Sequence, residues 1–461
     1  MSNPGSQFTR AIRLPQATAL VVGTIIGASI FVQPAEVTGR VPSLPGALLV
    51  WLVAGVLTFF GSLVTAEWAA VKPESGGVYA FLRDAFSPAL GFLWGWAMFW
   101  TMHSGIIAAI AVVFARYLAW FVPLDETGVR VVGVAAILAL SWVNFLGVRQ
   151  ASTLQTTLTV VKVGAVVLMI AIGLALVPSG QPAAAAGVDA TAGIAFARGA
   201  PEGGLLGGGS FRDFLLALVA GLFAFGGWHM VTYSAEETVD PRKTIPRSLV
   251  LGIAIVTATY LALNYVYFRI LPIETVIASE RIAADAADAV LGRGGGSVMS
   301  GLVALSTFGA LAGIVLAGPR VYHAMARDGL LFRWVADLHR IRRTPHRAIL
   351  LQAGWASVLV WTESYRALFT RVVYTEWIFF GLMALGLIFF RRASDAPEPL
   401  VARWAYPWVP IVFAICAFGI VANQVAAQPV DSIIGLGLVL IGLPVYALVV
   451  KRWADQPGSS S

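Results

Sequence analysis

Long stretches without a charged side chain constrain this chain more than any other feature of its sequence. A helix crosses the hydrocarbon of a bilayer with about 20 mostly apolar residues. Ten runs of roughly that length contain no Asp, Glu, Lys or Arg: 14–35, 41–66, 85–115, 131–148, 163–188, 214–235, 248–268, 294–319, 404–430 and 432–450. Two shorter runs, 348–362 and 377–390, bring the total to twelve. The pattern predicts an all-α polytopic membrane protein of about twelve transmembrane helices, organised as one membrane domain over 1–461.

Composition and charge agree with a chain that lies mostly in lipid. The sequence is 58% hydrophobic and 12% charged, whereas a soluble domain has about 25% charged residues. Its net charge of +7 does not require a nucleic-acid partner, because the basic residues lie between the apolar runs. With the N-terminus in the cytoplasm, inner segments carry 19 of the 31 Lys and Arg residues and outer segments carry 10. This bias predicts that both termini are cytoplasmic, and residues 1–16 contain no apolar core of a cleavable signal peptide.

Small residues interrupt the first and the sixth apolar run at mid-span. The first reads VVGTIIGASIF over 21–31, and the sixth reads GLFAFGGW over 221–228. Glycine weakens a helix, and backbone groups freed inside lipid must be satisfied by protein, water or a substrate. A broken helix offers N–H donors to an anion at one end and carbonyl oxygens to a cation at the other. The pair of breaks therefore predicts a site for a zwitterion, with close helix packing through small residues as the alternative.

The positions of the two breaks indicate an internal repeat. Helices 1–5 are expected within 15–177 and helices 6–10 within 212–391, so that each half begins with a broken helix. This is the arrangement of an inverted repeat in a transporter, where the substrate lies between the halves. Two further helices are expected within 404–450.

Several motifs resemble one family of transporters. Residues 23–31 (GTIIGASIF) and 223–228 (FAFGGW) resemble helices 1 and 6 of the amino acid–polyamine–organocation (APC) superfamily, and DPRKTIP at 240–246 resembles its bacterial L-type amino-acid transporter branch. Further matches follow in the family's order at 73–79, 144–147, 327–329 and 442–446. The resemblance implies a LeuT-like fold, in which five plus five helices form an inverted repeat and two more are added. It also implies alternating access around a site in mid-membrane.

The same resemblance implies a binding site for an α-amino acid. The backbone N–H groups expected to bind the substrate carboxylate are those near Gly27, Ala28, Ser29 and Ile30. The carbonyl groups expected to bind the α-amino group are those of Thr24 or Ile25 and of Phe223, Ala224 and Gly226. Phe223 is also the expected aromatic gate over the substrate. Ala28-Ser29 replaces the Ser-Gly that the family usually has, which narrows the space over the carboxylate.

Lys162 is the most informative ionisable residue, because it lies in the apolar segment TTLTVVKVG at 156–164. A charge inside the bilayer is costly, so an ionisable residue there is a functional candidate by default. The resemblance implies that Lys162 takes the place of a sodium ion found in related folds, as a fixed ammonium between the first helix and the fifth. Two alternatives stay open: a proton carrier, and a lysine that snorkels to the cytoplasmic surface.

Four acidic residues are further candidates for gating or specificity. Glu67, Glu236 and Glu237 lie near the expected cytoplasmic ends of the second and sixth helices, either as gate salt bridges or as rim charges. Glu376 begins the tenth helix. It either faces the cavity and favours a cationic substrate side chain, or lies at the outer rim without a specific role.

The chain lacks what other functional classes require. Five scattered histidines and one cysteine, Cys416, form no nucleophile–base pair or metal cluster at a recognisable spacing. We therefore predict no enzyme, no metal site and no cofactor. A channel filter needs symmetric repetition, which the sequence does not show. His103 and His229 lie at membrane depth, where packing of a hydrogen-bonded ring is favoured over proton coupling.

The predicted function is sodium-independent exchange of neutral amino acids by alternating access. Proton-coupled symport, transport of cationic amino acids or amines, and amino-acid sensing by a transport fold are the alternatives. The cysteine that links human L-type light chains to a heavy chain has no counterpart between the third and fourth helices, so no disulfide-linked partner is expected. The expected location is the bacterial inner membrane.

Overall fold

The computed structural model of the chain describes residues 12–73, 76–176, 204–292, 294–342, 344–362, 365–393 and 405–454. The described ranges form helices joined by short connections. The first half contains α1 (Leu14–Ile25), η1 (Ser29–Phe31), α2 (Gln33–Arg40), α3 (Leu44–Val71), α4 (Val78–Ala85), α5 (Pro88–Ala97), η2 (Met98–Met102), α6 (His103–Leu118), α7 (Glu126–Leu146) and α8 (Val148–Leu176).

The rest of the described chain continues the helical pattern. Its elements are α10 (Phe211–Ala224), η4 (Trp228–Glu237), α11 (Pro241–Ile270), α12 (Ile273–Ala278), α13 (Ile282–Leu291), α14 (Gly295–Arg327), η5 (Arg333–Ala336), α15 (His346–Thr362), α16 (Tyr365–Ala393), α17 (Trp408–Ala427), α18 (Pro429–Leu440) and α19 (Gly442–Ala454).

As far as the structure describes them, the twelve apolar runs coincide with helices or with broken pairs of helices. Within the described residues, nine helices are long and apolar enough to cross a membrane, and Leu14–Ile25 and Ser432–Leu448 are shorter apolar helices. The predicted all-α polytopic fold is therefore confirmed. The weak ninth candidate, 348–362, is α15, whose 17 residues fall just below the length of a full span.

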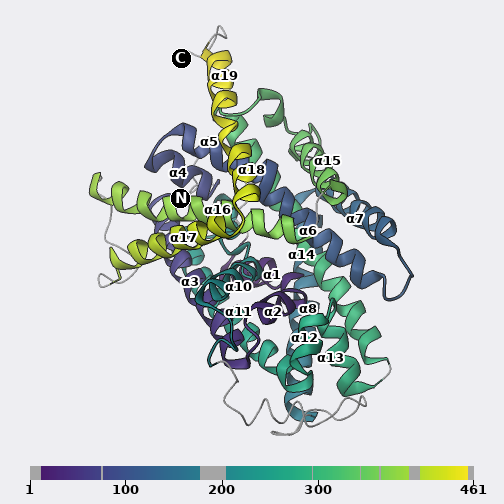
Figure 1. Cartoon of the computed structure of the whole chain (residues 1–461). Helices are drawn as coiled ribbons and strands as arrows, with labels where there is room; N and C mark the ends of the chain where they lie inside the picture. Colours follow the sequence, from purple (N-terminus) through teal and green to yellow (C-terminus); the bar gives the residue numbers. More distant parts are fainter. Residues whose placement is uncertain are drawn as a thin grey trace.

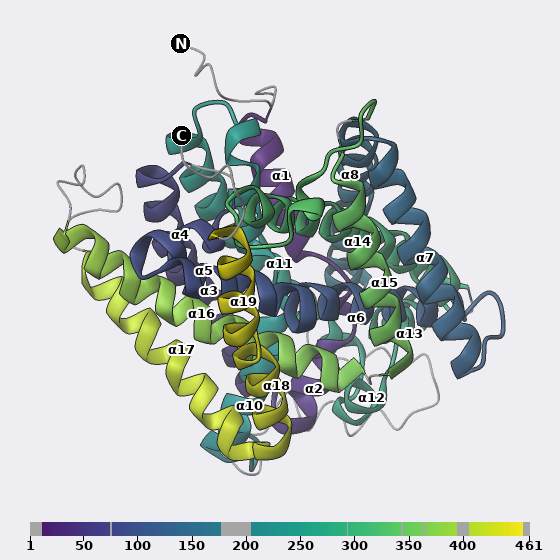
Figure 2. The ribbon, with the colours of Figure 1, turned by 90° about the horizontal axis from the view of Figure 1, so that it is seen from above.

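The broken helices lie in the interior of the bundle. In both views α16 and α17 lie on one side and α7 and α15 on the other, and in Figure 1 α1 and α10 lie between them (Figures 1 and 2). In the most apolar stretch of Phe211–Ala235, 83% of the residues are buried. In the most apolar stretch of Trp408–Ala427, only 33% of the residues are buried. Large apolar side chains of α7, α8 and α17 are exposed, among them Trp142, Val160 and Ile415, as expected of surfaces that face lipid acyl chains.

Both predicted breaks are present. The α-helical part of the first span ends at Ile25, and Ile26 has an extended ψ of 87° before the short 3₁₀ turn η1. The sixth span changes from α10 to the 3₁₀ helix η4 across Gly227, whose φ of +93° is a left-handed conformation that glycine adopts without a steric penalty. The third span also departs from regular geometry, with a π-helical turn at Met98–Met102.

A proline inside α14 creates a further irregularity, and polar side chains compensate for it. Pro319 has no N–H, so the carbonyl oxygen of Val315 loses the hydrogen bond that residue i+4 normally donates. Asn144 of α7 donates to this oxygen at 3.2 Å, and Gln352 of α15 donates to it at 3.0 Å. The two amides satisfy a backbone group that lipid could not, and they attach α7 and α15 to the kink.

This arrangement predicts coupling between Asn144 and Gln352. Asn144→Leu or Gln352→Leu alone is expected to cost about 0.6 kcal/mol of unfolding free energy, because the other amide still donates to Val315. The double variant leaves the carbonyl without a donor, which costs about 1–3 kcal/mol, so its loss should exceed the sum of the single losses. Unfolding by SDS titration in mixed micelles measures all three.

Gln424→Leu serves as the control for this cycle. The Gln424 amide donates to the side chain of Gln428 at 2.9 Å and not to a proline-freed carbonyl. In a double variant with Asn144→Leu, the two losses of unfolding free energy should simply add. Additive losses for Asn144→Leu and Gln352→Leu would contradict the shared role at Val315.

Candidate substrate site

A pocket lies where the two broken helices meet. Its lining residues are Thr24, Ile25, Gly27, Ser29, Ile106, Ile110, Phe223, Gly226, Gly227, Ile314, Val372 and Glu376. Six of the nine residues predicted to bind substrate are among them. The other three, Ala28, Ile30 and Ala224, are buried next to the pocket without lining it. The structure therefore brings the two breaks together around one enclosed space.

The break in the first span leaves a row of backbone N–H groups without acceptors. In the described part of the chain, no hydrogen bond is donated by the N–H groups of Gly27, Ala28, Ser29 or Ile30. Helical pairing resumes only at Phe31, whose N–H donates to the Ala28 carbonyl at 3.1 Å. Consecutive free N–H groups at a helix start attract an anion. They are the groups predicted to bind a carboxylate.

The carbonyl groups at the breaks are partly occupied by a residue that the sequence did not single out. The hydroxyl of Tyr260, on α11, lies 2.9 Å from the carbonyl oxygen of Ile25 and 3.0 Å from that of Ala224. The Phe223 carbonyl accepts from the Gly226 N–H at 2.9 Å. Three of the five carbonyl groups predicted to meet an α-amino group thus already have a protein donor within reach. Tyr260 joins the two breaks through a single hydroxyl.

A second contact joins the breaks directly. The Thr24 hydroxyl lies 3.3 Å from the Gly227 carbonyl oxygen, and it also reaches the Leu20 and Val21 carbonyls of its own helix. A Cβ atom at Gly227 would lie 3.4 Å from the backbone oxygen of Thr24. The glycine therefore allows both a left-handed turn and a close approach of the two chains.

Lys162 of α8 is buried and reaches the first span. Its ammonium donates a hydrogen bond to the Gly23 carbonyl oxygen, just before the break. The side chain is 1% exposed, so it does not snorkel to the surface. Gly23 lets α8 approach, because a Cβ atom there would lie 2.6 Å from the Thr159 hydroxyl. The amine thus lies on a carbonyl at the end of a broken helix, where a cation is favoured.

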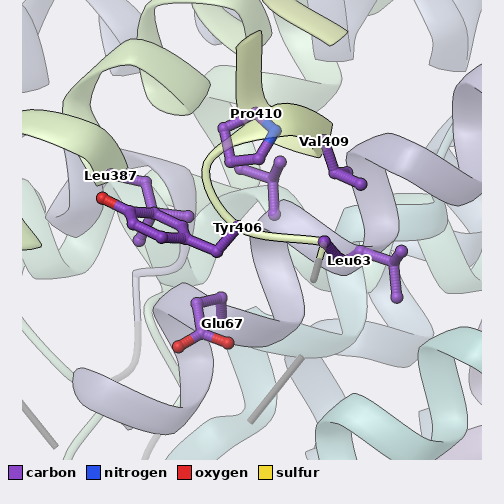
Figure 3. Close-up of a pocket in the computed structure, with 8 residues that line it drawn as sticks. Leu63, Glu67, Leu387, Tyr406, Val409 and Pro410 are labelled. Carbon is purple, nitrogen blue, oxygen red and sulfur yellow. The ribbon is translucent and has the colours of Figure 1, made fainter. Parts of the chain in front are cut away.

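The acidic candidates lie in different environments. Glu376 lines the pocket and is 6% exposed, so it faces the cavity and not the outer rim. Glu236 and Glu237 are in η4, but their side chains lie outside the described part. Glu67 forms a buried ion pair with Arg391, which ties α3 to α16. A separate pocket lies around Glu67 (Figure 3). It is lined by Leu63, Leu387, Tyr406, Val409 and Pro410.

The two histidines at membrane depth have contrasting surroundings. His103 Nε2 lies 2.7 Å from the Ile314 carbonyl oxygen, next to the α14 kink. His229 packs within 6 Å of four aromatic rings, those of Trp94, Trp228, Tyr233 and Phe380. Its Nδ1 has no hydrogen-bond partner among the described residues. Both rings are therefore packed inside the bundle.

A polar cluster outside the spans connects α4 to the end of α14, and the sequence did not indicate it. Asp328 accepts from the Tyr79 hydroxyl at 2.8 Å and from Arg83 at 2.6 Å. Burial, and then the Asp328 carboxylate, raise the pKa of the Tyr79 phenol well above its ordinary range. Tyr79 is therefore a neutral donor at any physiological pH, and the cluster keeps its charge balance.

The role of Tyr260 can be tested against a matched residue on the same helix. Tyr260→Phe removes the single O–H group that two buried carbonyl oxygens share, so it should lower the unfolding free energy by about 1–3 kcal/mol. Tyr267 is equally buried, but its hydroxyl has no partner in the described part of the chain. Tyr267→Phe should be neutral or stabilising. Unfolding by SDS titration measures both, and equal losses would show that Tyr260 acts only by packing.

Comparisons with known proteins show the family of the chain. Residues 12–443 match the amino acid permease family. Large neutral amino acids transporter small subunit 2 of Mus musculus is 32% identical, with 98% of this chain and 83% of that protein covered. Asc-type amino acid transporter 1 of Mus musculus is 31% identical (97% and 82% covered), and the cystine/glutamate transporter of Homo sapiens is 27% identical (98% and 87% covered).

The family match spans almost the entire chain, from before α1 into α19. It includes both breaks, Lys162 and Glu376, and it agrees with the resemblance noted from the motifs. The chain belongs to the amino acid permease family, within the APC superfamily.

Proposed function

We propose that this permease exchanges α-amino acids across the membrane without sodium, by alternating access, and that neutral amino acids are among its substrates. The carrying observation is the pocket between the two breaks. Its lining includes Gly27 and Ser29, whose N–H groups donate no hydrogen bond among the described residues, together with residues of both broken spans. A zwitterion matches this arrangement, because its carboxylate takes the N–H groups and its ammonium takes carbonyl oxygens such as those of Thr24 and Gly226.

Lys162 supports the sodium-independent part of the proposal. Its ammonium already lies on the Gly23 carbonyl. A sodium ion at this place would need several oxygen ligands, and it would repel the fixed positive charge. The lysine thus supplies the charge that holds α8 against the broken span, and no ion need be bound or released in each cycle.

The named relatives support amino acids as substrates. They are transporters of large neutral amino acids, of the Asc type, and of cystine and glutamate. In this proposal 15–177 and 212–391 are the inverted repeats, which move against each other. The protein transports its substrate and does not act as an enzyme. The gate formed by Phe223, and by Glu237 at the cytoplasmic end, belongs to the same proposal.

The positive-inside bias and the cysteine content bear on location and partners. We place both termini in the cytoplasm of a bacterial cell and the chain in its inner membrane. The only cysteine, Cys416, is on α17 and not in the connection between α6 and α7. The chain is therefore proposed to work without a disulfide-linked heavy chain.

Lys162 variants test the mechanism. Lys162→Ala and Lys162→Met remove a charge-assisted hydrogen bond worth about 1.5–3 kcal/mol, so exchange should fall by roughly ten- to a hundredfold. The measurement is uptake of labelled neutral amino acids into proteoliposomes, with and without internal amino acid, sodium and a pH gradient. Wild-type uptake should require internal amino acid and ignore sodium. Lys243→Met, at an exposed lysine, should leave uptake unchanged.

Two results would contradict this mechanism. Stimulation by sodium would show that Lys162 does not replace the ion. Uptake that follows the pH gradient without internal amino acid would make the protein a proton symporter, with the buried amine of Lys162 as a possible proton carrier.

A further inference from the structure

The pocket between the breaks has two chemically different walls. One wall belongs to the broken spans and offers main-chain groups near Gly27 and Gly226. The second wall is built from side chains of α6, α14 and α16. Its members are Ile106, Ile110, Ile314, Val372 and Glu376. If the main-chain groups hold the carboxylate and ammonium of an amino acid, as proposed above, this second wall meets the substrate side chain.

Glu376 is the charged side chain of that wall, and its charge is not balanced by the protein. It is 6% exposed. Among the described residues it has no salt bridge and no hydrogen-bond partner. Glu67 differs from Glu376 in this respect, because it forms a buried ion pair with Arg391. An ionised carboxylate buried in a membrane protein is costly unless a cation pairs with it, so a cation in the pocket would stabilise the charged form of Glu376.

The surroundings of Glu376 indicate which cation fits. A metal ion would require several oxygen ligands, and the described side chains contain no group of three or more His, Cys, Asp or Glu that could hold one. The other side chains of this wall are three isoleucines and a valine. An aliphatic chain packs on such residues, and an ammonium or guanidinium at its end reaches the carboxylate. Snorkelling lysine side chains combine the same two features.

We propose that this wall is a subsite for a cationic substrate side chain on an aliphatic stem, with Glu376 as the specificity-determining residue. Basic amino acids of the lysine and ornithine type are then substrates in addition to neutral ones. The inference rests on the proposed function, because the main-chain ends of the substrate must lie on the two breaks. It goes beyond that function because it assigns the chemical class of the substrate side chain. The names of the relatives reported above do not mention basic amino acids.

The test compares lysine with a neutral amino acid of the same stem. L-Lysine, L-ornithine and L-norleucine compete with a labelled neutral amino acid that the wild type exchanges in proteoliposomes. In wild type, lysine and ornithine should inhibit more strongly than norleucine. In Glu376→Gln the ratio of the lysine to the norleucine inhibition constant should rise by about thirtyfold or more, because a buried charge pair is lost.

Two further variants separate the charge effect from general damage. Glu376→Asp keeps the charge on a shorter side chain, and it should retain part of the preference for lysine. Glu274→Gln makes the same chemical change at an exposed position of α12, and the inhibition ratio should stay at the wild-type value. Thermal unfolding with and without ligand gives a second readout, since lysine should raise the midpoint of wild type but not of Glu376→Gln.

The possible results distinguish this inference from the proposed function. If neutral amino acids exchange but lysine and ornithine neither compete nor stabilise wild type, the subsite is wrong and the exchange function stands. If no amino acid is exchanged, the proposed function fails, and lysine-dependent stabilisation that requires Glu376 would still support the subsite. Uptake that follows a pH gradient in wild type but not in Glu376→Gln would overturn the subsite, because Glu376 would then carry a proton.

Discussion

Backbone groups that leave a helix inside a bilayer have no water to bind, and the structure of this permease depends on how it supplies their partners. At the break in the first span, the Gly23 carbonyl takes the Lys162 ammonium and the Ile25 carbonyl takes the Tyr260 hydroxyl. The same hydroxyl reaches Ala224 in the sixth span. Three helices, α1, α8 and α11, are thereby held at one point. Among the described residues, the N–H groups of 27–30 donate no hydrogen bond, and the pocket lies beside them.

The kink at Pro319 obeys the same rule without creating a binding site. Its freed carbonyl, that of Val315, faces two amide side chains in place of a cavity. The His103 ring binds the adjacent Ile314 carbonyl. The Ile314 and Val315 carbonyls are thus both bound by side chains of neighbouring helices, which attaches α6, α7 and α15 to the kink. An interrupted helix becomes a ligand site only where the protein leaves some of the freed groups unpaired.

Charged side chains inside the bundle also differ in whether the protein supplies their partner. Glu67 and Arg391 neutralise each other and join α3 to α16, and Glu67 lines a pocket separate from the one between the breaks (Figure 3). Lys162 is satisfied by a backbone carbonyl. Glu376 faces the pocket without a protein cation. The contrast between these three residues is the reason to connect Glu376 with the substrate, and the resemblance to neutral amino-acid transporters does not by itself suggest that connection.

The sequence by itself determined the elements of the fold. The charge-free runs located the apolar helices of the bundle, and the glycines at 23, 27, 226 and 227 located both breaks. These signals are local, because they depend on lipid and backbone conformation alone. Lys162 could be singled out because one charge in an apolar segment is conspicuous. Tyr260 could not, since a tyrosine in an apolar run is common and its hydroxyl gains meaning only when two carbonyls from distant helices meet it. For the same reason Asn144 and Gln352 gave no signal for their shared acceptor. Only the tertiary structure decided that Glu67 is paired while Glu376 faces the pocket, because the direction in which a side chain points depends on how the helices rotate and pack against one another.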